Sequence, residues 1–283
     1  MFVIHGLERV KSCLAYSALT DTLVYIPQIR HLLFSVPIVK WGPDATPVEQ
    51  QLIVNHAIIK ILSLAAQSLI TLVVQGPNAF NLVGSNLRFP SLLDLSLPNL
   101  IQPQAQDLAS SMLPALERLH ITHAGGYTQS IRFWELIAKL TPSLTSIRLS
   151  SVGDCWLPPF MRILLDVPAH QDRGYVYAIE DEFPPDTVDA TRSTKVASQL
   201  NRLVLVILQP QIYPSGGRCG TGAIKHGSVV HILQGVARET RDRKIGERQL
   251  WMLEESTEYG LEEAVKDWSE IANGKDGPWQ LPA

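Results

Sequence analysis

The chain has 283 residues, of which 46% are hydrophobic and 18% charged, and its formal net charge is −3. This composition supplies a continuous core and excludes an intrinsically disordered protein, and the slightly acidic balance gives no general attraction to nucleic acid or to an anionic membrane. Three widely separated cysteines, Cys13, Cys155 and Cys219, exclude a disulfide framework and a Cys-x-x-Cys zinc site, so we expect an intracellular protein, cytoplasmic or nuclear.

The first sixty-odd residues predict helices on either side of a short strand. Met1 to Pro27 has the apolar spacing of a helix, and Ile29-x-x-Leu32-x-Phe34 then resembles a strand. Thr46-Pro47-Val48-Glu49 is a capping box that opens a helix through about Ala66. The uncharged run Ile61 to Val74 is shorter than the roughly twenty residues of a membrane span, and a helix followed by a buried strand explains it better.

A short motif, Leu-x-x-Leu-x-Leu, then recurs at intervals of 23, 24 and 28 residues. Leucine-rich repeats are about 20–29 residues long, and each contributes one strand and one helix or 3₁₀ turn. The intervals therefore predict one strand per motif. The copies are Leu69-x-x-Leu72-x-Val74, Leu92-x-x-Leu95-x-Leu97, Leu116-x-x-Leu119-x-Ile121 and Leu144-x-x-Ile147-x-Leu149.

Local signals around the motifs agree with this assignment. A proline stands shortly before three of them and disfavours helix there; these are Pro90, Pro114 and Pro142. Apolar residues at helical spacing predict helices over Pro103 to Met112 and Ser130 to Leu140. Weaker copies follow downstream, at Tyr177-x-Ile179, at Leu200-x-x-Leu203-x-Leu205 and in the run Gln249 to Leu253.

One strand-helix unit cannot bury its own apolar face, whereas stacked units give every motif leucine a neighbour above and below. We therefore expect an α/β leucine-rich-repeat-like solenoid over residues 1–253, with a parallel sheet on the concave side and helices on the convex side. Residues 254–283, with a helix at roughly Glu258 to Ala272, are predicted to form a C-terminal cap. The alternative is a doubly wound α/β domain, which usually carries continuous Val/Ile runs and a Gly-rich first turn.

The chain shows no convincing catalytic, cofactor or metal motif. His120 and His123 lie three apart, which places them on opposite faces of a strand, so we expect one surface and one loop histidine and no metal site. The glycine-rich stretch from Pro210 to Gly222 lacks the Lys-Ser/Thr of a phosphate loop and is predicted to be a surface loop. No enzyme activity and no cofactor are therefore expected.

The repeat register predicts a binding face instead. Residues flanking the second leucine of each motif point to the open, concave side of the sheet, which solenoids use for binding. Arginine and histidine dominate the middle of this face, so a protein partner with an acidic or phosphorylated segment is the expected ligand. The loop face around Pro210 to Gly222 is the alternative site. The predicted partner-binding residues are Asp94, Arg118, His120, Arg148 and Arg202.

Two strand phrases and the tail resemble a known group. The phrases begin at Phe89 and Leu113, and the tail combines Asp267-Trp268 with Gly274-Lys-Asp-Gly-Pro-Trp279. They are similar to the leucine-rich-repeat portion of the large F-box-like protein families of mushroom-forming fungi. In that family an N-terminal F-box docks a ubiquitin-ligase adaptor, and the repeats recruit substrate.

This chain departs from the family because Met1 to Pro27 already resembles a repeat helix, with no Leu-Pro-x-Glu-Ile-like F-box opening before it. A ubiquitin-ligase adaptor is therefore expected as a partner only if an F-box lies upstream. The leading expectation is a non-catalytic protein–protein interaction scaffold. The alternative is the substrate-receptor part of an SCF-type ubiquitin ligase without a recognisable F-box, and an enzyme of unknown type comes third. No nucleic-acid or membrane partner is expected.

Overall fold

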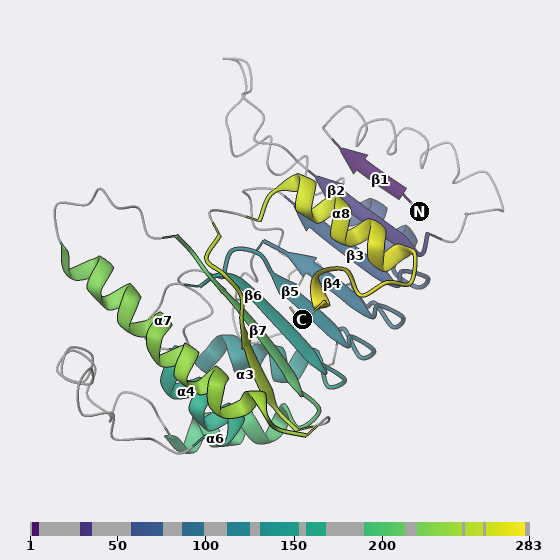
Figure 1. Cartoon of the computed structure of the whole chain (residues 1–283). Helices are drawn as coiled ribbons and strands as arrows, with labels where there is room; N and C mark the ends of the chain where they lie inside the picture. Colours follow the sequence, from purple (N-terminus) through teal and green to yellow (C-terminus); the bar gives the residue numbers. More distant parts are fainter. Residues whose placement is uncertain are drawn as a thin grey trace, which may run out of the picture. The chain divides into compact units, whose positions relative to one another are not determined.

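The computed structural model describes residues 2–5, 29–35, 58–75, 87–98, 112–124, 131–152, 157–167, 190–212, 220–244, 247–256 and 259–280 (Figure 1). The chain forms two compact units. The first contains Met1–Leu119 together with Gly260–Ala283, and the second contains His120–Tyr259. The division predicted from the sequence, at residues 253 and 254, remains a prediction.

The described strands follow one another in the sheet in sequence order, from β1 to β8. The pairings β1–β2, β2–β3, β3–β4, β6–β7 and β7–β8 are all parallel. An α/β fold with a parallel sheet is therefore confirmed. The strands are β1 (Phe2–His5), β2 (His31–Ser35), β3 (Thr71–Gln75), β4 (Asp94–Leu97), β5 (Arg118–Ile121), β6 (Ser146–Val152), β7 (Leu205–Pro210) and β8 (Gln249–Met252).

The motif leucines of the first unit lie in register. Leu32 of β2 is opposite Leu72 of β3, and Leu72 is opposite Leu95 of β4. These three side chains and Leu119 are all buried. Because side chains alternate along a strand, the leucines occupy one face of the sheet and the residues between them occupy the other.

A turn precedes the Leu-x-x-Leu-x-Leu motif in both units, and this turn explains why a proline stands before three of the copies. The N–H of Leu92 donates to the carbonyl of Phe89, that of Leu116 to Leu113, and that of Leu144 to Thr141. Pro90, Pro114 and Pro142 therefore each stand second in a turn. The fixed φ of proline suits this position, and its missing N–H is not needed there.

After the turn, the first backbone N–H groups of the strand donate to a carbonyl at the start of the preceding strand. The N–H groups of Leu93 and Asp94 both donate to the carbonyl of Ile70, and those of Glu117 and Arg118 both donate to the carbonyl of Leu93. The same arrangement recurs in the second unit, where Val204 and Leu205 donate to Thr145. A repeated backbone pattern thus accompanies the repeated leucines.

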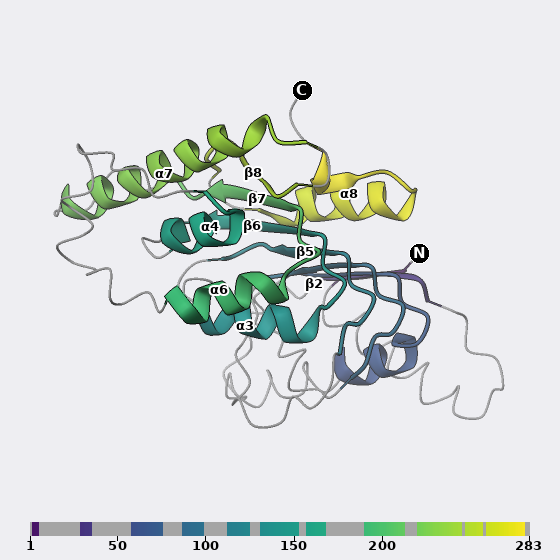
Figure 2. The same ribbon diagram turned by 90° about the horizontal axis from the view of Figure 1, so that it is seen from below.

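Helices cover both faces of the first unit (Figure 2). Residues 58–65 are helical and bury Ile58, Ile61 and Leu62. On the opposite side of the strands lies α8 (Leu261–Ala272), which contacts β2 and β3 and packs against the 3₁₀ turn η3 (Gly277–Trp279). The helix expected at roughly Glu258 to Ala272 thus begins at Leu261.

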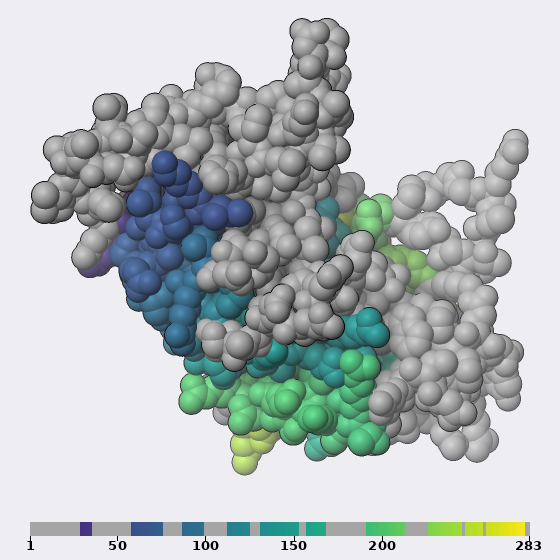
Figure 3. Space-filling model, turned by 180° about the vertical axis from the view of Figure 1, so that it is seen from behind, coloured from purple at the N-terminus to yellow at the C-terminus, as the bar shows by residue number. Residues whose placement is uncertain are grey.

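The second unit contains α3 (Ile131–Leu140), α4 (Leu157–Leu165), α6 (Ala190–Gln199) and α7 (Gly220–Arg241). Helix α6, green in Figure 3, contacts α3 and α4, while α7 contacts α4 and β8. Phe133, Trp134 and Phe160 are buried: the Trp134 ring of α3 lies 4.8 Å from the Phe160 ring of α4, and Phe133 meets Trp134 edge to face. Among the described residues, no helix has the length and apolar character needed to cross a membrane.

Three local predictions differ from the structure. Phe2–His5 is a parallel strand and not the start of a helix, and α7 begins at Gly220, inside the predicted loop. The downstream motif is displaced by three residues, because Leu205 and not Arg202 lies opposite Ser146. Three further predictions fall wholly or mostly outside the described residues. They are the rest of the helix at Met1 to Pro27, the helix at Pro103 to Met112 apart from Met112, and the copy at Tyr177-x-Ile179; the capping box at Thr46 to Glu49 also lies outside them.

Candidate binding face

The strand residues that alternate with the motif leucines form the face predicted to bind a partner, and we call it the polar face. Its rows follow from the strand pairing: Thr71 is opposite Asp94 in the first unit, and in the second unit Arg148 is opposite Ile207, which is opposite Trp251. The polar face includes His31, Thr71, Gln75, Asp94, Ser96 and Arg118 in the first unit, and Ser146, Arg148, Ser150, Gln209, Gln249 and Trp251 in the second.

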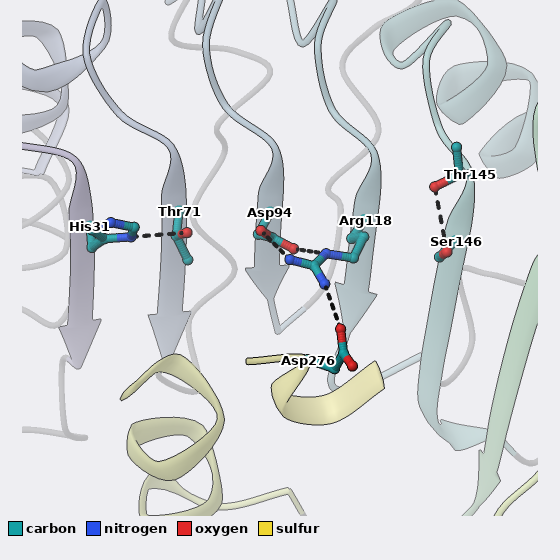
Figure 4. A network of polar contacts seen from close by, with 7 residues as sticks. All are labelled: His31, Thr71, Asp94, Arg118, Thr145, Ser146 and Asp276. Carbon is teal, nitrogen blue, oxygen red and sulfur yellow. Dashed lines mark hydrogen bonds and ion pairs between the residues drawn. The ribbon is translucent and has the colours of Figure 1, made fainter. Parts of the chain in front are cut away.

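An ion pair joins β4 and β5 on this face in the first unit (Figure 4). Arg118 donates through Nε to Asp94 Oδ1 and through Nη2 to Oδ2 at 2.8 Å, which is a bidentate geometry. Burial raises the pKa of Asp94, and the hydrogen bonds from Arg118 oppose that rise. The carboxylate therefore depends on Arg118 for its charge and is not an independent acid.

The C-terminal segment reaches the same ion pair. Asp276, just before η3, places its carboxylate 3.9 Å from Arg118 Nη1. On the neighbouring strands His31 Nδ1 lies 3.2 Å from Thr71 Oγ1, and burial is the main cause that lowers the pKa of His31. This part of the face therefore presents no uncompensated positive charge.

A buried polar cluster lies on the polar face of the second unit. His120 Nε2 is 2.9 Å from Ser150 Oγ, and Ser150 donates in turn to Gln209 Oε1 at 3.1 Å. Arg148 Nη2 also donates to Gln209 Oε1 at 3.1 Å. Tyr259 covers the cluster, with its ring 4.6 Å from the His120 ring and 5.8 Å from Arg148 Cζ.

These contacts determine where the proton of His120 lies. Ser150 has one hydroxyl proton and gives it to Gln209, so Ser150 Oγ accepts from His120 and Nε2 carries the proton. Nδ1 then holds a lone pair, and it is buried without a hydrogen-bond partner in the described part of the chain. Burial, and next Arg148, lower the pKa of His120 well below its ordinary value. The ring is therefore neutral.

Beyond this cluster, the polar face becomes partly exposed at β7 and β8. Leu205, Gln249, Trp251 and Leu253 are each partly exposed. The exposed Arg241, at the end of α7, places its guanidinium 5.8 Å from the centre of the Trp251 ring. An arginine stacked on a partly exposed tryptophan is a favourable cation–π arrangement and presents both charge and apolar area.

The five residues predicted to bind a partner do not form an open strip. Asp94 is 5% exposed, His120 is 1% exposed and Arg148 is 9% exposed, so their side chains are inside the protein. The expectation that His120 is a surface histidine is therefore wrong. Arg202 is exposed but lies in the turn before β7, outside the strands. Asp94 and Arg118 bond to each other.

The sequence reading missed the residues that cover the polar face or remain exposed on it, which are Tyr259, Trp268, Asp276, Arg241 and Trp251. Motif spacing identifies strand positions, but it carries no information on which distant segment returns to cover them. For Trp251 a signal was present, because Gln249 to Leu253 reads as a strand with tryptophan at its centre. Within the described residues, no three His, Cys, Asp or Glu side chains come together as a metal site.

Comparison with known proteins adds no assignment. No protein-family model matches the chain, and neither the curated proteins nor the solved structures gave a significant match.

Proposed function

We propose that the chain is an α/β solenoid of the leucine-rich-repeat type, and that it acts as a non-catalytic scaffold that binds another protein. The parallel strands in sequence order, the leucines in register and the recurrent turn before the strands support the repeat architecture. The binding site proposed here is the partly exposed end of the polar face, at Trp251 and Arg241.

One observation carries this choice of site. Trp251 and Arg241 form a stacked pair in the second unit, whereas Arg148, the arginine within the strands of that unit, is buried. Tryptophan and arginine dominate the binding energy of many protein interfaces, particularly where apolar neighbours exclude water from them. Leu205 and Leu253, both partly exposed, provide such neighbours.

The charge of the site favours an acidic partner. Arg238 and Arg241 both lie in the last turn of α7 and are both exposed. A partner segment that presents a carboxylate to Arg241 and an apolar side chain to Trp251 fits both groups, since guanidinium groups bind carboxylates in a bidentate manner.

The test compares partner recovery by the parent chain and by two variants, Trp251→Ala and Arg241→Glu, after cross-linking in cell extract. Each partner recovered by the parent is then purified, and its affinity for each chain is measured directly. We expect both variants to weaken binding at least tenfold while the melting temperature stays near that of the parent.

Arg202→Glu is the matched control, because Arg202 is an exposed arginine of the same unit outside the strands. It should leave the affinity unchanged. Equal affinity of the parent, Trp251→Ala and Arg241→Glu for every partner, or loss of binding in Arg202→Glu alone, contradicts the proposed site.

A further inference from the structure

The C-terminal segment, residues 260–280, covers the polar face of the first unit. Helix α8 contacts β2 and β3, and η3 packs against α8. Ala264 and Trp268 of α8 are buried, and so are Gly277, Pro278 and Trp279. Leu33 and Val73, which lie on the polar face of β2 and β3, are also buried. An apolar surface on the sheet thus has an apolar cover from the other end of the chain.

The segment from 260 to 280 has internal contacts of its own. At its start, the Glu263 carboxylate accepts the N–H of Gly260 at 3.1 Å, and at the end of α8 the Asn273 side chain donates to the carbonyl of Ser269 at 2.8 Å. Gly277 has φ +53°, and a Cβ there would lie 2.8 Å from the carbonyl oxygen of Asp267 and 2.9 Å from Ile271 Cγ1. Only glycine lets η3 fold this closely onto α8.

Two polar groups where α8 meets β3 have no hydrogen-bond partner among the described residues. They are Trp268 Nε1 of α8 and Gln75 Nε2 of β3, and both are buried. Water can bond to both groups when the segment leaves, so the docked state carries a cost that opposes its apolar burial.

The charged contact of the segment is also weak. Asp276 is 76% exposed and lies 3.9 Å from Arg118, whose main partner is Asp94. An exposed ion pair of this length contributes little, because water and salt screen it. The segment is therefore held mainly by Trp268 and the η3 turn, and Asp276 lies on the side of the segment that faces Arg118.

We propose that residues 260–280 are an exchangeable occupant of a binding face on the first unit. In their place, this face binds a segment of a separate partner protein with the same chemistry. That chemistry is a short amphipathic helix with a tryptophan on its buried side, followed by a turn that presents an aspartate to Arg118. This inference concerns the first unit and does not depend on the site at Trp251.

The experiment uses a fluorescent peptide of residues 260–280 as the probe. Its binding is measured to the full parent chain and to a Gly277→Val chain. Valine at a φ of +53° collides with Asp267 and Ile271, which both belong to α8, so the variant disturbs the segment and leaves the sheet face unchanged. In the parent chain the tethered segment competes at an effective concentration on the order of mM. We expect the peptide to bind the Gly277→Val chain at least tenfold more tightly than the parent.

Two controls accompany this measurement. Lys275→Val introduces the same side chain at an exposed position of the same turn, and it should bind the peptide no better than the parent does. A peptide with Trp268→Ala should bind the Gly277→Val chain at least tenfold more weakly than the natural peptide. Equal binding of both peptides, or no gain in a folded Gly277→Val chain, overturns the proposal. Concentration-dependent dimers of the parent that the peptide dissociates would assign the face to a second copy and overturn the separate partner.

If Gly277→Val does not fold, hydrogen exchange of the unmodified chain provides a second test. Opening of the segment alone predicts that backbone amides of 265–272 exchange at least tenfold faster than those of Thr71–Gln75. Equal protection of the two sets means that α8 opens only with the whole unit, which also overturns the proposal.

Discussion

Leu95 of β4 lies directly opposite Leu72 of β3, and both side chains are buried. The two residues are 23 positions apart, which is the interval between their motifs. A leucine at this position therefore contacts the equivalent leucine of its neighbour, and the loss of one side chain removes contacts on both sides.

Leu95→Ala should lower the free energy of unfolding by roughly 2–5 kcal/mol, through lost burial and the cavity that remains. Urea denaturation of the parent and the variant measures the difference. Leu64→Ala, at an exposed leucine, is the control and should cost within about 0.5 kcal/mol. An equally small change for Leu95→Ala would mean that Leu95 is not buried between the leucines of the neighbouring strands.

The sequence predicted β2 to β5 well because the motif reports burial on one face with a fixed period, whereas β1 carries no such motif and was predicted to be helical. The downstream copy was misread because both Leu200-x-x-Leu203-x-Leu205 and Leu203-x-x-Val206-x-Leu208 satisfy the pattern. In the structure Leu203 donates to Leu200 in the turn, as Leu144 does to Thr141, so the second reading is correct. No proline marks this turn, and the local signal that located the other turns was missing.

The exposure of the polar face could not be predicted in the same way. The alternation of side chains correctly assigned Asp94, Arg118, His120 and Arg148 to one face. Whether that face is open depends on contacts between segments far apart in the sequence, such as α8 on β2 and β3. Composition of the tail indicated a helix and a turn, but nothing in it specified the strand that they contact.

Arg248 is expected to be a major stabilising residue of the second unit. It donates through Nη1 to the carbonyl of Leu164 in the last turn of α4 at 2.5 Å. Through Nη2 it donates to the carbonyls of Ala197, in the last turn of α6, and of Leu200, just after α6, both at 2.9 Å. Carbonyls at helix ends have no partner within the helix, and a cation there is favourable. Arg248→Met should therefore cost at least about 2 kcal/mol, since each lost charged hydrogen bond contributes about 1.5–3 kcal/mol.

Thermal and urea unfolding of Arg248→Met measure this effect, with Arg202→Met as the exposed control. The free energy of unfolding of Arg248→Lys should lie between those of Arg248→Met and the parent, because an ammonium supplies the charge but not the planar guanidinium that reaches both helices. If Arg248→Met and Arg248→Lys both lower the free energy of unfolding only slightly, these contacts do not stabilise the unit.

The ion pair between Arg192 of α6 and Glu135 of α3 should contribute much less. Its two hydrogen bonds are 2.5 and 2.6 Å long, and the bond from Arg192 is the main cause that lowers the pKa of Glu135. Both side chains are more than a third exposed, so water and salt screen the pair. A double-mutant cycle with Glu135→Gln and Arg192→Gln should give a coupling of about 0.5–1 kcal/mol. The coupling should decrease in 1 M salt, and a value above about 2 kcal/mol would contradict this account.

Stability should decrease as the pH falls below about 6.5, because His120 is neutral and buried in the folded state. Its folded pKa is lowered, so between that pKa and 6.5 the unfolded chain binds more protons, and the free energy of unfolding rises with pH. For one such histidine the loss between pH 7.5 and pH 5.5 approaches about 1.4 kcal/mol. Burial lowers the pKa of His31 as well, so this residue adds in the same direction.

Replacing His120 by glutamine separates the two histidines. The Gln side chain can place an amide N–H where Nε2 donates to Ser150, but it has no group that titrates in this range, so the variant should lose the part of the pH dependence that belongs to His120. Urea denaturation at pH 7.5 and 5.5 measures the difference for the parent, for His120→Gln and for His123→Gln as a control on the same segment. The control should keep the parental pH dependence. If His120→Gln keeps it too, His120 takes up a proton as readily in the folded chain as in the unfolded chain, and the assignment of a neutral ring with its only proton on Nε2 is wrong.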